Sequence, residues 1–168
     1  MTEILGDYVT FIADVERVLE ACGIAVDELT QCDMLNYECS TNERYDEVKK
    51  ALEGSARILN ETKHGGRLIA ILQAEPRLIA GDWRVPYIEL LQPKPTRENI
   101  DGIDSVFFVT TLALPEFLKR HADVDFETKG LANKANPYVE LKTDGIAVKF
   151  HDRHMGAVLE IERMLESN

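Results

Sequence analysis

The order of predicted elements repeats once along this chain of 168 residues. The segment 32–93 reads as an extended stretch, a helix and three extended stretches, and the segment 104–153 follows the same order. The first copy comprises CDMLNYECS, NERYDEVKKALEG, SARILNETK, GRLIAILQAE and VPYIELLQP, and the second comprises IDSVFFVTT, LPEFLKRHA, DFETKG, NPYVELKT and GIAVKFHDR. A repeated unit constrains the fold of the whole chain. Two tandem βαβββ units predict an α+β protein whose curved mixed sheet surrounds a cup.

Helical patterns flank the two units. An apolar stripe at helical spacing predicts a helix over about residues 7–22, which we expect to pack across the outside of the sheet. A further helix should begin near Leu114, where Pro115 suits a first turn, and another should span about residues 153–166. We expect a single domain over residues 1–168, with sub-units 1–94 and 103–168 joined by a linker at about 92–102.

Composition excludes several classes of partner. The net charge of −11 and the absence of a Lys/Arg patch argue against nucleic acid binding. No apolar run approaches the roughly 20 residues that span a bilayer, so no membrane partner is expected. The three cysteines form no CxxC motif and suit free thiols, and the acidic N-terminus is unlike a signal peptide. These features predict a cytoplasmic protein, and a homodimer using sheet edges and outer helices is one possible assembly.

Four segments resemble the YecM family. They are GIAVDELTQCDMLNYECS, RLIAIL with VPYIELLQPKP, IDGIDSVFFV and TDGIAVKFH, and the likeness runs from about Asp7 to His151. YecM proteins in turn resemble the vicinal oxygen chelate superfamily, which includes glyoxalase I, ring-cleaving dioxygenases and antibiotic-sequestering proteins. The resemblance implies the paired βαβββ fold that the repeat predicts.

The superfamily resemblance also implies a divalent metal held by one residue from each of four strands. The corresponding positions here are Met34, Glu89, Ser105 and Lys149. A thioether and a hydroxyl are poor substitutes for imidazole ligands, and an ammonium group repels a cation. We therefore expect no metal and no other cofactor. Instead, Lys149 could neutralise Glu89 directly, which predicts an ion pair of roughly 4 Å or less if their strands lie side by side.

Strand alternation predicts which side chains share the cup with Glu89, because successive residues face opposite sides of a sheet. The cup-facing set that we expect to bind a ligand is Met34, Asn36, Glu38, Tyr87, Ser105 and Phe107. The opposite faces carry Leu35, Tyr37, Ile88, Leu90, Val148 and Phe150, which are mostly apolar as core faces should be. His151 shares the cup side with Lys149, although a surface position at a strand end is the plainer interpretation.

Two functional hypotheses follow. The first is a metal-free small-molecule binding protein with a vicinal-oxygen-chelate-like cup. The second is an enzyme of the isomerase or lyase type, with Glu89 as base and Lys149 or His151 as acid, or with a metal bound by an unrecognised ligand set. The pair His151 and His154 more simply marks a solvated turn than a metal site.

Overall fold

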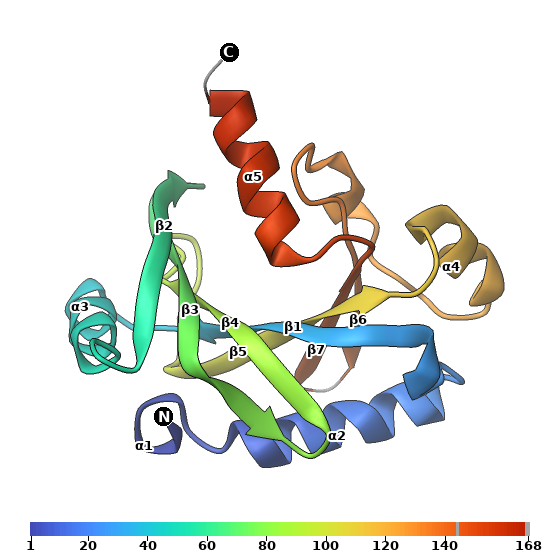
Figure 1. The fold of residues 1–168 in the computed structure, drawn as a ribbon, viewed down its shortest axis with the longest axis horizontal. Coiled ribbons are helices and arrows are strands. Elements are labelled where there is room, and N and C mark those ends of the chain that lie inside the picture. Colours follow the sequence, from blue (N-terminus) through green and yellow to red (C-terminus); the bar gives the residue numbers. More distant parts are fainter. Residues whose placement is uncertain (144, 167–168) are drawn as a thin grey trace.

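The computed structural model describes residues 1–143 and 145–166. Its helices are α1 (Thr2–Leu5), α2 (Tyr8–Ala21), α3 (Asn42–Ala51), α4 (Leu114–Arg120) and α5 (Met155–Glu166), with 3-10 turns η1 (Val26–Glu28) and η2 (Lys129–Ala132). Its strands are β1 (Leu29–Glu38), β2 (Ala56–His64), β3 (Arg67–Ala80), β4 (Trp83–Leu91), β5 (Gly102–Thr110), β6 (Val139–Thr143) and β7 (Ile146–His151). They form a mixed sheet in the order β2-β3-β4-β1-β5-β7-β6 (Figure 1).

The sheet contains two related halves that meet at its centre. β1 pairs in parallel with β4, and β5 pairs in parallel with β7. β3 continues the first half antiparallel to β4, as β6 continues the second half antiparallel to β7. β1 and β5 run antiparallel and join the halves. The predicted α+β fold, with its mixed sheet and N-terminal helix, is confirmed.

The second half is shorter than predicted, because the expected extended stretch DFETKG does not form a full strand. This stretch pairs with β6 through an isolated bridge between Glu127 and Glu140, and the chain then turns into η2. The apolar residue of this segment, Phe126, packs on Phe117 and Phe150, with ring centroids 5.8 and 5.7 Å apart. Packing of this aromatic cluster therefore replaces continued strand pairing.

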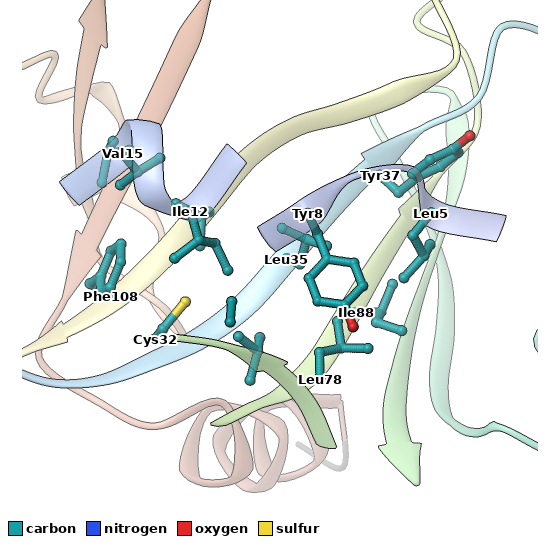
Figure 2. Close-up of a cluster of buried hydrophobic side chains, with 14 of the residues drawn as sticks. Leu5, Tyr8, Ile12, Val15, Cys32, Leu35, Tyr37, Leu78, Ile88 and Phe108 are labelled. Atoms are coloured by element: carbon teal, nitrogen blue, oxygen red, sulfur yellow. The ribbon is translucent and has the colours of Figure 1, made fainter. Parts of the chain in front are cut away.

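The outer face, which we define as the sheet face covered by α2, α3 and α4, carries the main apolar core. Ile12 and Val15 of α2 lie over Leu35 and Phe108 of the sheet (Figure 2). The strand residues predicted to face a core, namely Leu35, Tyr37, Ile88, Leu90, Val148 and Phe150, all belong to this cluster. Burial of these large side chains supplies most of the apolar stabilisation.

The inner face, the opposite side of the sheet, is covered in part by α5. In Figure 1, α5 stands between β2 and the segment that contains η2. Its residues Met155, Val158 and Leu159 belong to a smaller buried cluster with Met34 and Phe107 of the strands. The inner face is therefore apolar where α5 packs on it.

Two expectations from composition can be compared with the structure. Cys22, Cys32 and Cys39 are all free thiols. Within the described ranges, no helix combines the length and the apolar character needed to cross a membrane.

Candidate ligand-binding site on the inner face

Asn36 lies at the centre of the inner face. Its cross-strand neighbours are Glu89 of β4 and Ser105 of β5. The Asn36 side chain is fully buried, and neither its Nδ2 nor its Oδ1 has a hydrogen-bond partner among residues 1–143 and 145–166. Ser105 Oγ donates instead to Asp104 Oδ2 at 3.2 Å. Each unpaired buried polar group costs about 1–3 kcal/mol, so a ligand that satisfied the amide would be bound favourably.

Glu89 lies beside Asn36 and is partly buried. Burial raises the pKa of the Glu89 carboxyl, and the opposing fields of Lys149 and Arg67 do not cancel this effect. A carboxyl whose pKa is raised by burial can exchange a proton closer to neutral pH than an exposed one. Glu89 is therefore suited both to hydrogen bonding with a ligand and to proton transfer.

Lys149 reaches the inner face from β7, and its ammonium group lies over two aromatic rings. The distances from Nζ to the ring centroids of Phe107 and Tyr138 are 5.0 and 5.6 Å. Cation–π contacts of this kind hold a charge in place without neutralising it. Within the described part of the chain, this ammonium group has neither an ion-pair partner nor a hydrogen bond.

The predicted ion pair between Glu89 and Lys149 is wrong, because their strands are not neighbours. β1 and β5 separate β4 from β7. Each unit pairs its last strand with its own first strand, which places the two charged residues in different halves of the sheet. They interact through their electric fields, since Lys149 lowers the pKa of Glu89.

Met34, Tyr87 and Phe107 form the apolar half of the inner face, and all three pack in the cluster that includes α5. The helix packs so closely here that glycine is favoured at position 156, because a Cβ added at Gly156 of α5 would lie 3.3 Å from the Tyr87 hydroxyl oxygen. These three predicted binding residues thus lie under the helix rather than in the open part of the face.

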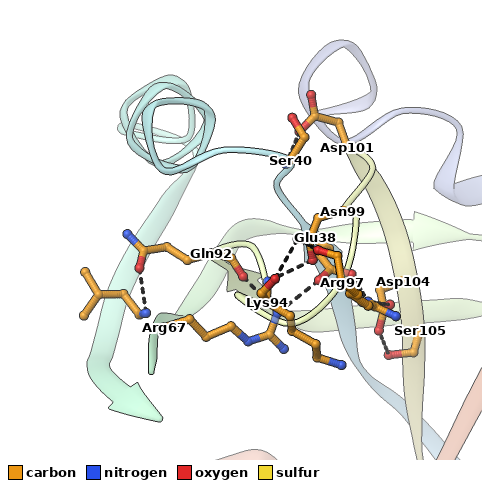
Figure 3. A network of polar contacts seen from close by, with 11 residues as sticks. Glu38, Ser40, Arg67, Gln92, Lys94, Arg97, Asn99, Asp101, Asp104 and Ser105 are labelled. Atoms are coloured by element: carbon orange, nitrogen blue, oxygen red, sulfur yellow. Dashed lines mark hydrogen bonds and ion pairs between the residues drawn. The ribbon is translucent and has the colours of Figure 1, made fainter. Parts of the chain in front are cut away.

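The polar half of the inner face lies beside the loop 92–101 (Figure 3). Arg67 Nη1 pairs with the buried Glu38 carboxylate at 3.2 Å, and Arg97 also pairs with it. Arg97 further pairs with Asp104 at 3.3 Å. Burial, followed by the fields of Arg97 and Arg67, lowers the pKa of Lys94. This loop is therefore part of the candidate site and not only a connection.

Sequence reasoning found Glu38 but missed Arg67, Lys94 and Arg97. Two of these cations lie in the segment interpreted as a linker, and the third begins β3. The only available signal was the basic character of PKPTR, within a chain that is otherwise strongly acidic.

His151 lies at the other end of the inner face, beneath the start of α5. The expectation of a surface or solvated position is wrong, since the side chain is fully buried. Its Nδ1 lies 2.9 Å from Asn136 Oδ1, and its Nε2 lies 3.3 Å from Asp33 Oδ2. His154, in contrast, is exposed.

Asp33 was also missed, because a β-bulge between Cys32 and Met34 changes the alternation of β1. It is fully buried and accepts hydrogen bonds from the Met155 N–H at 2.6 Å and from Gln31 Nε2 at 2.7 Å. A carboxylate at a helix N-terminus stabilises the helix through its unpaired N–H groups and its dipole. Asp33 therefore fixes the start of α5 to the sheet.

The four positions at which the resemblance implies a metal do not fit one. Met34 packs under α5, the Ser105 hydroxyl donates to Asp104, and the Lys149 ammonium group lies against aromatic rings. Only Glu89 offers a suitable oxygen donor. Among the residues that the structure describes, no group of three or more His, Cys, Asp or Glu side chains is placed to hold a metal ion.

A pocket of about 400 Å³ opens beside the polar half of the inner face. It lies between the end of β1, the start of β5 and the hairpin of β6 and β7, and its lining includes Glu38, Arg97, Asp104 and Ala147. Ala147 faces the same side of β7 as Lys149. The pocket therefore gives a small molecule access to Glu38, Arg97 and Asp104 at this edge of the face.

Comparisons with known proteins identify a family and a fold. A family model described as YecM protein matches residues 1–134. The structure titled "Structural Genomics, Protein EC4020" is similar, with a TM-score of 0.75 and 20% identity, over 91% of this chain and 87% of that one. The hypothetical protein BH1468 from Bacillus halodurans C-125 is similar with a TM-score of 0.51 and 14% identity, over 73% and 94% of the two chains. No curated protein matches the sequence.

Proposed function

This chain belongs to the YecM family, and we propose that it binds a small polar molecule on the inner face of its sheet without the help of a metal. The observation that carries the proposal is the Asn36 amide, which is fully buried and unpaired among the described residues. A purely structural position at the centre of a sheet is more stable with an apolar side chain, because an unmade hydrogen bond destabilises the fold. Glu89 beside it adds a second, partly buried polar group.

The family resemblance supports the same location. Proteins of the vicinal oxygen chelate superfamily use the enclosed face of paired βαβββ units, and several bind or sequester small molecules there. Of the residues at the four metal positions, Lys149 supplies a positive charge and Glu89 a carboxyl, which suit direct contacts with a ligand. Fold similarity alone does not determine function, so the polar residues of the face carry the argument.

Thermal unfolding in the presence of small polar metabolites tests the proposal. A ligand that binds the folded state raises the unfolding temperature by an amount that grows with the logarithm of its concentration once this exceeds Kd. We expect at least one compound to stabilise the wild-type protein and to lose this effect in Asn36→Leu. Thr62→Val on β2 is a control with a similar loss of polarity away from Asn36. Stabilisation that persists unchanged in Asn36→Leu would contradict the proposal.

An isomerase or lyase is the second candidate, and the raised pKa of Glu89 favours it. Glu89 would then act as the general base, with Lys149 or His151 as the acid. If the enzyme instead used a metal, treatment with a chelator would abolish its activity, and metal analysis would find about one divalent ion per chain, lost in Glu89→Ala. Activity that resists chelation but disappears in Glu89→Gln would support metal-free catalysis.

A further inference from the structure

Asn36 is the one side chain among the described residues whose hydrogen-bond donor and acceptor are both buried and unpaired. Its cross-strand neighbours on the inner face are Glu89 and Ser105, and neither bonds to it. The Ser105 hydroxyl donates to Asp104 instead. Two adjacent positions of opposite hydrogen-bonding character are therefore left open on a single planar group.

The chemistry of the amide restricts which ligand group can satisfy both positions. Asn36 Nδ2 is a donor and Asn36 Oδ1 is an acceptor. An ionised carboxylate or a phosphate offers only acceptors, so it would pair with Nδ2 and leave Oδ1 facing a negative charge. An ammonium group offers only donors and would leave Nδ2 unpaired. Because an unmade buried hydrogen bond is costly, the best match is a group that carries its own donor and acceptor side by side.

An amide held in the cis arrangement is such a group. In a trans peptide bond the N–H and the C=O point to opposite sides, so one trans amide cannot reach both atoms of Asn36. In a lactam, an imide or a nucleobase the ring holds the N–H and the C=O on the same edge. The two hydrogen bonds then form in one plane, as they do when an asparagine side chain pairs with the edge of adenine.

The surroundings of Asn36 determine the direction of approach. Met34 and Phe107 are the next inner-face residues along β1 and β5, and they are buried beneath α5. Glu89, on the neighbouring strand β4, is partly exposed. The side towards α5 is thus closed, and a ligand would reach Asn36 past the Glu89 side chain. A small flat ring suits this narrow approach.

We infer that the ligand of the inner face carries a cis-amide edge, as in a lactam, an imide or a nucleobase, which pairs with both atoms of the Asn36 amide. The inference rests on the proposed function and specifies its ligand class. The ligand N–H would donate to Asn36 Oδ1, and Asn36 Nδ2 would donate to the ligand carbonyl. The Glu89 side chain would turn aside to admit the ring.

A nitrogen–proton NMR titration of the full chain tests this inference with 2-pyrrolidinone, N-methyl-2-pyrrolidinone, butyrate and ethylene glycol. The lactam should bind saturably with a Kd of about 10 mM or tighter, which is attainable for a ligand of about six non-hydrogen atoms. It should shift the side-chain amide signals of Asn36, which are assigned by their absence in Asn36→Leu. N-methylation of the lactam should weaken binding by about tenfold or more, because Asn36 Oδ1 then lacks a donor. Butyrate and ethylene glycol should bind more weakly than the lactam.

A pair of variants locates the binding. Asn36→Leu should weaken lactam binding by about tenfold or more. Asn60→Leu is the matched control, because Asn60 is a partly buried residue of β2 whose Nδ2 donates to Glu162 Oε2 at 3.5 Å. Circular dichroism establishes that each variant is folded. The four probes on the wild-type protein test the inference without any variant.

The outcomes separate this inference from the proposed function. Lactam binding that is lost on N-methylation and in Asn36→Leu, but kept in Asn60→Leu, would support it. Equal binding of the lactam and its N-methyl derivative, or binding that persists in Asn36→Leu, would overturn it. If butyrate or ethylene glycol binds through Asn36 while the lactam does not, the inference fails and the proposed function stands. If neither these probes nor other small polar metabolites bind, both fail.

Discussion

The two faces of the sheet differ in how well their buried groups are satisfied. On the outer face, Leu35, Phe108 and Phe150 meet helical side chains in a continuous apolar core. On the inner face, Asn36 is buried with its amide unpaired among the described residues, and Glu89 is partly buried with a raised pKa. The outer face is organised for stability, whereas the inner face keeps polar groups that reduce stability. Such groups are typical of functional sites, where the fold is less stable than its architecture allows.

The largest effect should come from the outer face. Phe108→Ala removes a fully buried ring that contacts Trp83, with centroids 5.2 Å apart. We expect a loss of about 3–5 kcal/mol in the free energy of unfolding, because a cavity replaces the ring. Urea denaturation provides the measurement, and Val9→Ala, at a position 43% exposed, is the control. A loss below about 1 kcal/mol would show that the outer face is loosely packed.

Glu38 should give the next largest effect, because it is the most buried ion-paired acid at the polar edge of the inner face. Glu38→Gln leaves Arg67, whose side chain is only 11% exposed, without its carboxylate. We expect a loss of about 3 kcal/mol in the free energy of unfolding, since an uncompensated charge remains buried. Glu98→Gln in the exposed part of the loop should change little. Equal effects of the two substitutions in urea denaturation would argue against a structural ion-pair network.

Asp33 should show a smaller, local effect. Asp33→Ala removes the acceptor of the Met155 N–H and of Gln31 Nε2. We expect a loss of about 2 kcal/mol, typical of a helix cap combined with an unpaired buried donor. Amide hydrogen exchange should accelerate in α5 more than in α2, because the Met155 N–H at the start of α5 donates to this carboxylate. Uniform acceleration throughout the protein would mean that α5 does not detach separately.

Glu89→Gln should stabilise the protein, with a pH dependence that identifies the cause. The folded-state pKa of Glu89 is raised above its ordinary value of 4.5, so the folded protein holds this proton more tightly than the unfolded chain does. The ionised residue therefore destabilises the fold above the raised pKa, and this penalty is lost as the pH falls from that pKa towards 4.5. The stability gain of Glu89→Gln should decline over the same range, as measured by urea denaturation at several pH values. A gain independent of pH would exclude burial of the charge as its origin.

Sequence patterns predicted the architecture because both units repeat an order of strands and helices, and because alternation separates Leu35 and Ile88 from Asn36 and Glu89. Strand adjacency was harder to predict. The ion pair assumed for Glu89 and Lys149 required β4 and β7 to be neighbours, whereas each pairs with the first strand of its own unit. No local signal in the sequence specifies this choice.

The remaining errors come from local irregularities and long-range contacts. The alternation of side chains between the two faces of β1 breaks at the bulge, which turns Asp33 towards the inner face. Counting every second residue therefore places Asp33 on the wrong face. Arg67 and Arg97 were missed because they are far apart in the sequence, and only the folded loop brings both to Glu38. His151 was misplaced because its burial depends on α5 and Asn136, which the strand pattern does not reveal.

Asn36→Leu should cause the least destabilisation of these substitutions, and for this reason it is the sharpest test of the difference between the faces. Leucine has a similar volume and removes an amide that is unpaired among the described residues, so the free energy of unfolding should stay within about 1 kcal/mol of wild type or rise. Leu35→Asn, the reverse change on the outer face one residue away, should destabilise by more than about 3 kcal/mol, because it buries an unpaired amide in an apolar core. Urea denaturation of both variants without ligand gives the comparison. If Asn36→Leu destabilised as strongly as Leu35→Asn, the Asn36 amide would be part of the packing of the protein, and the inner face would owe its polar centre to stability rather than to binding.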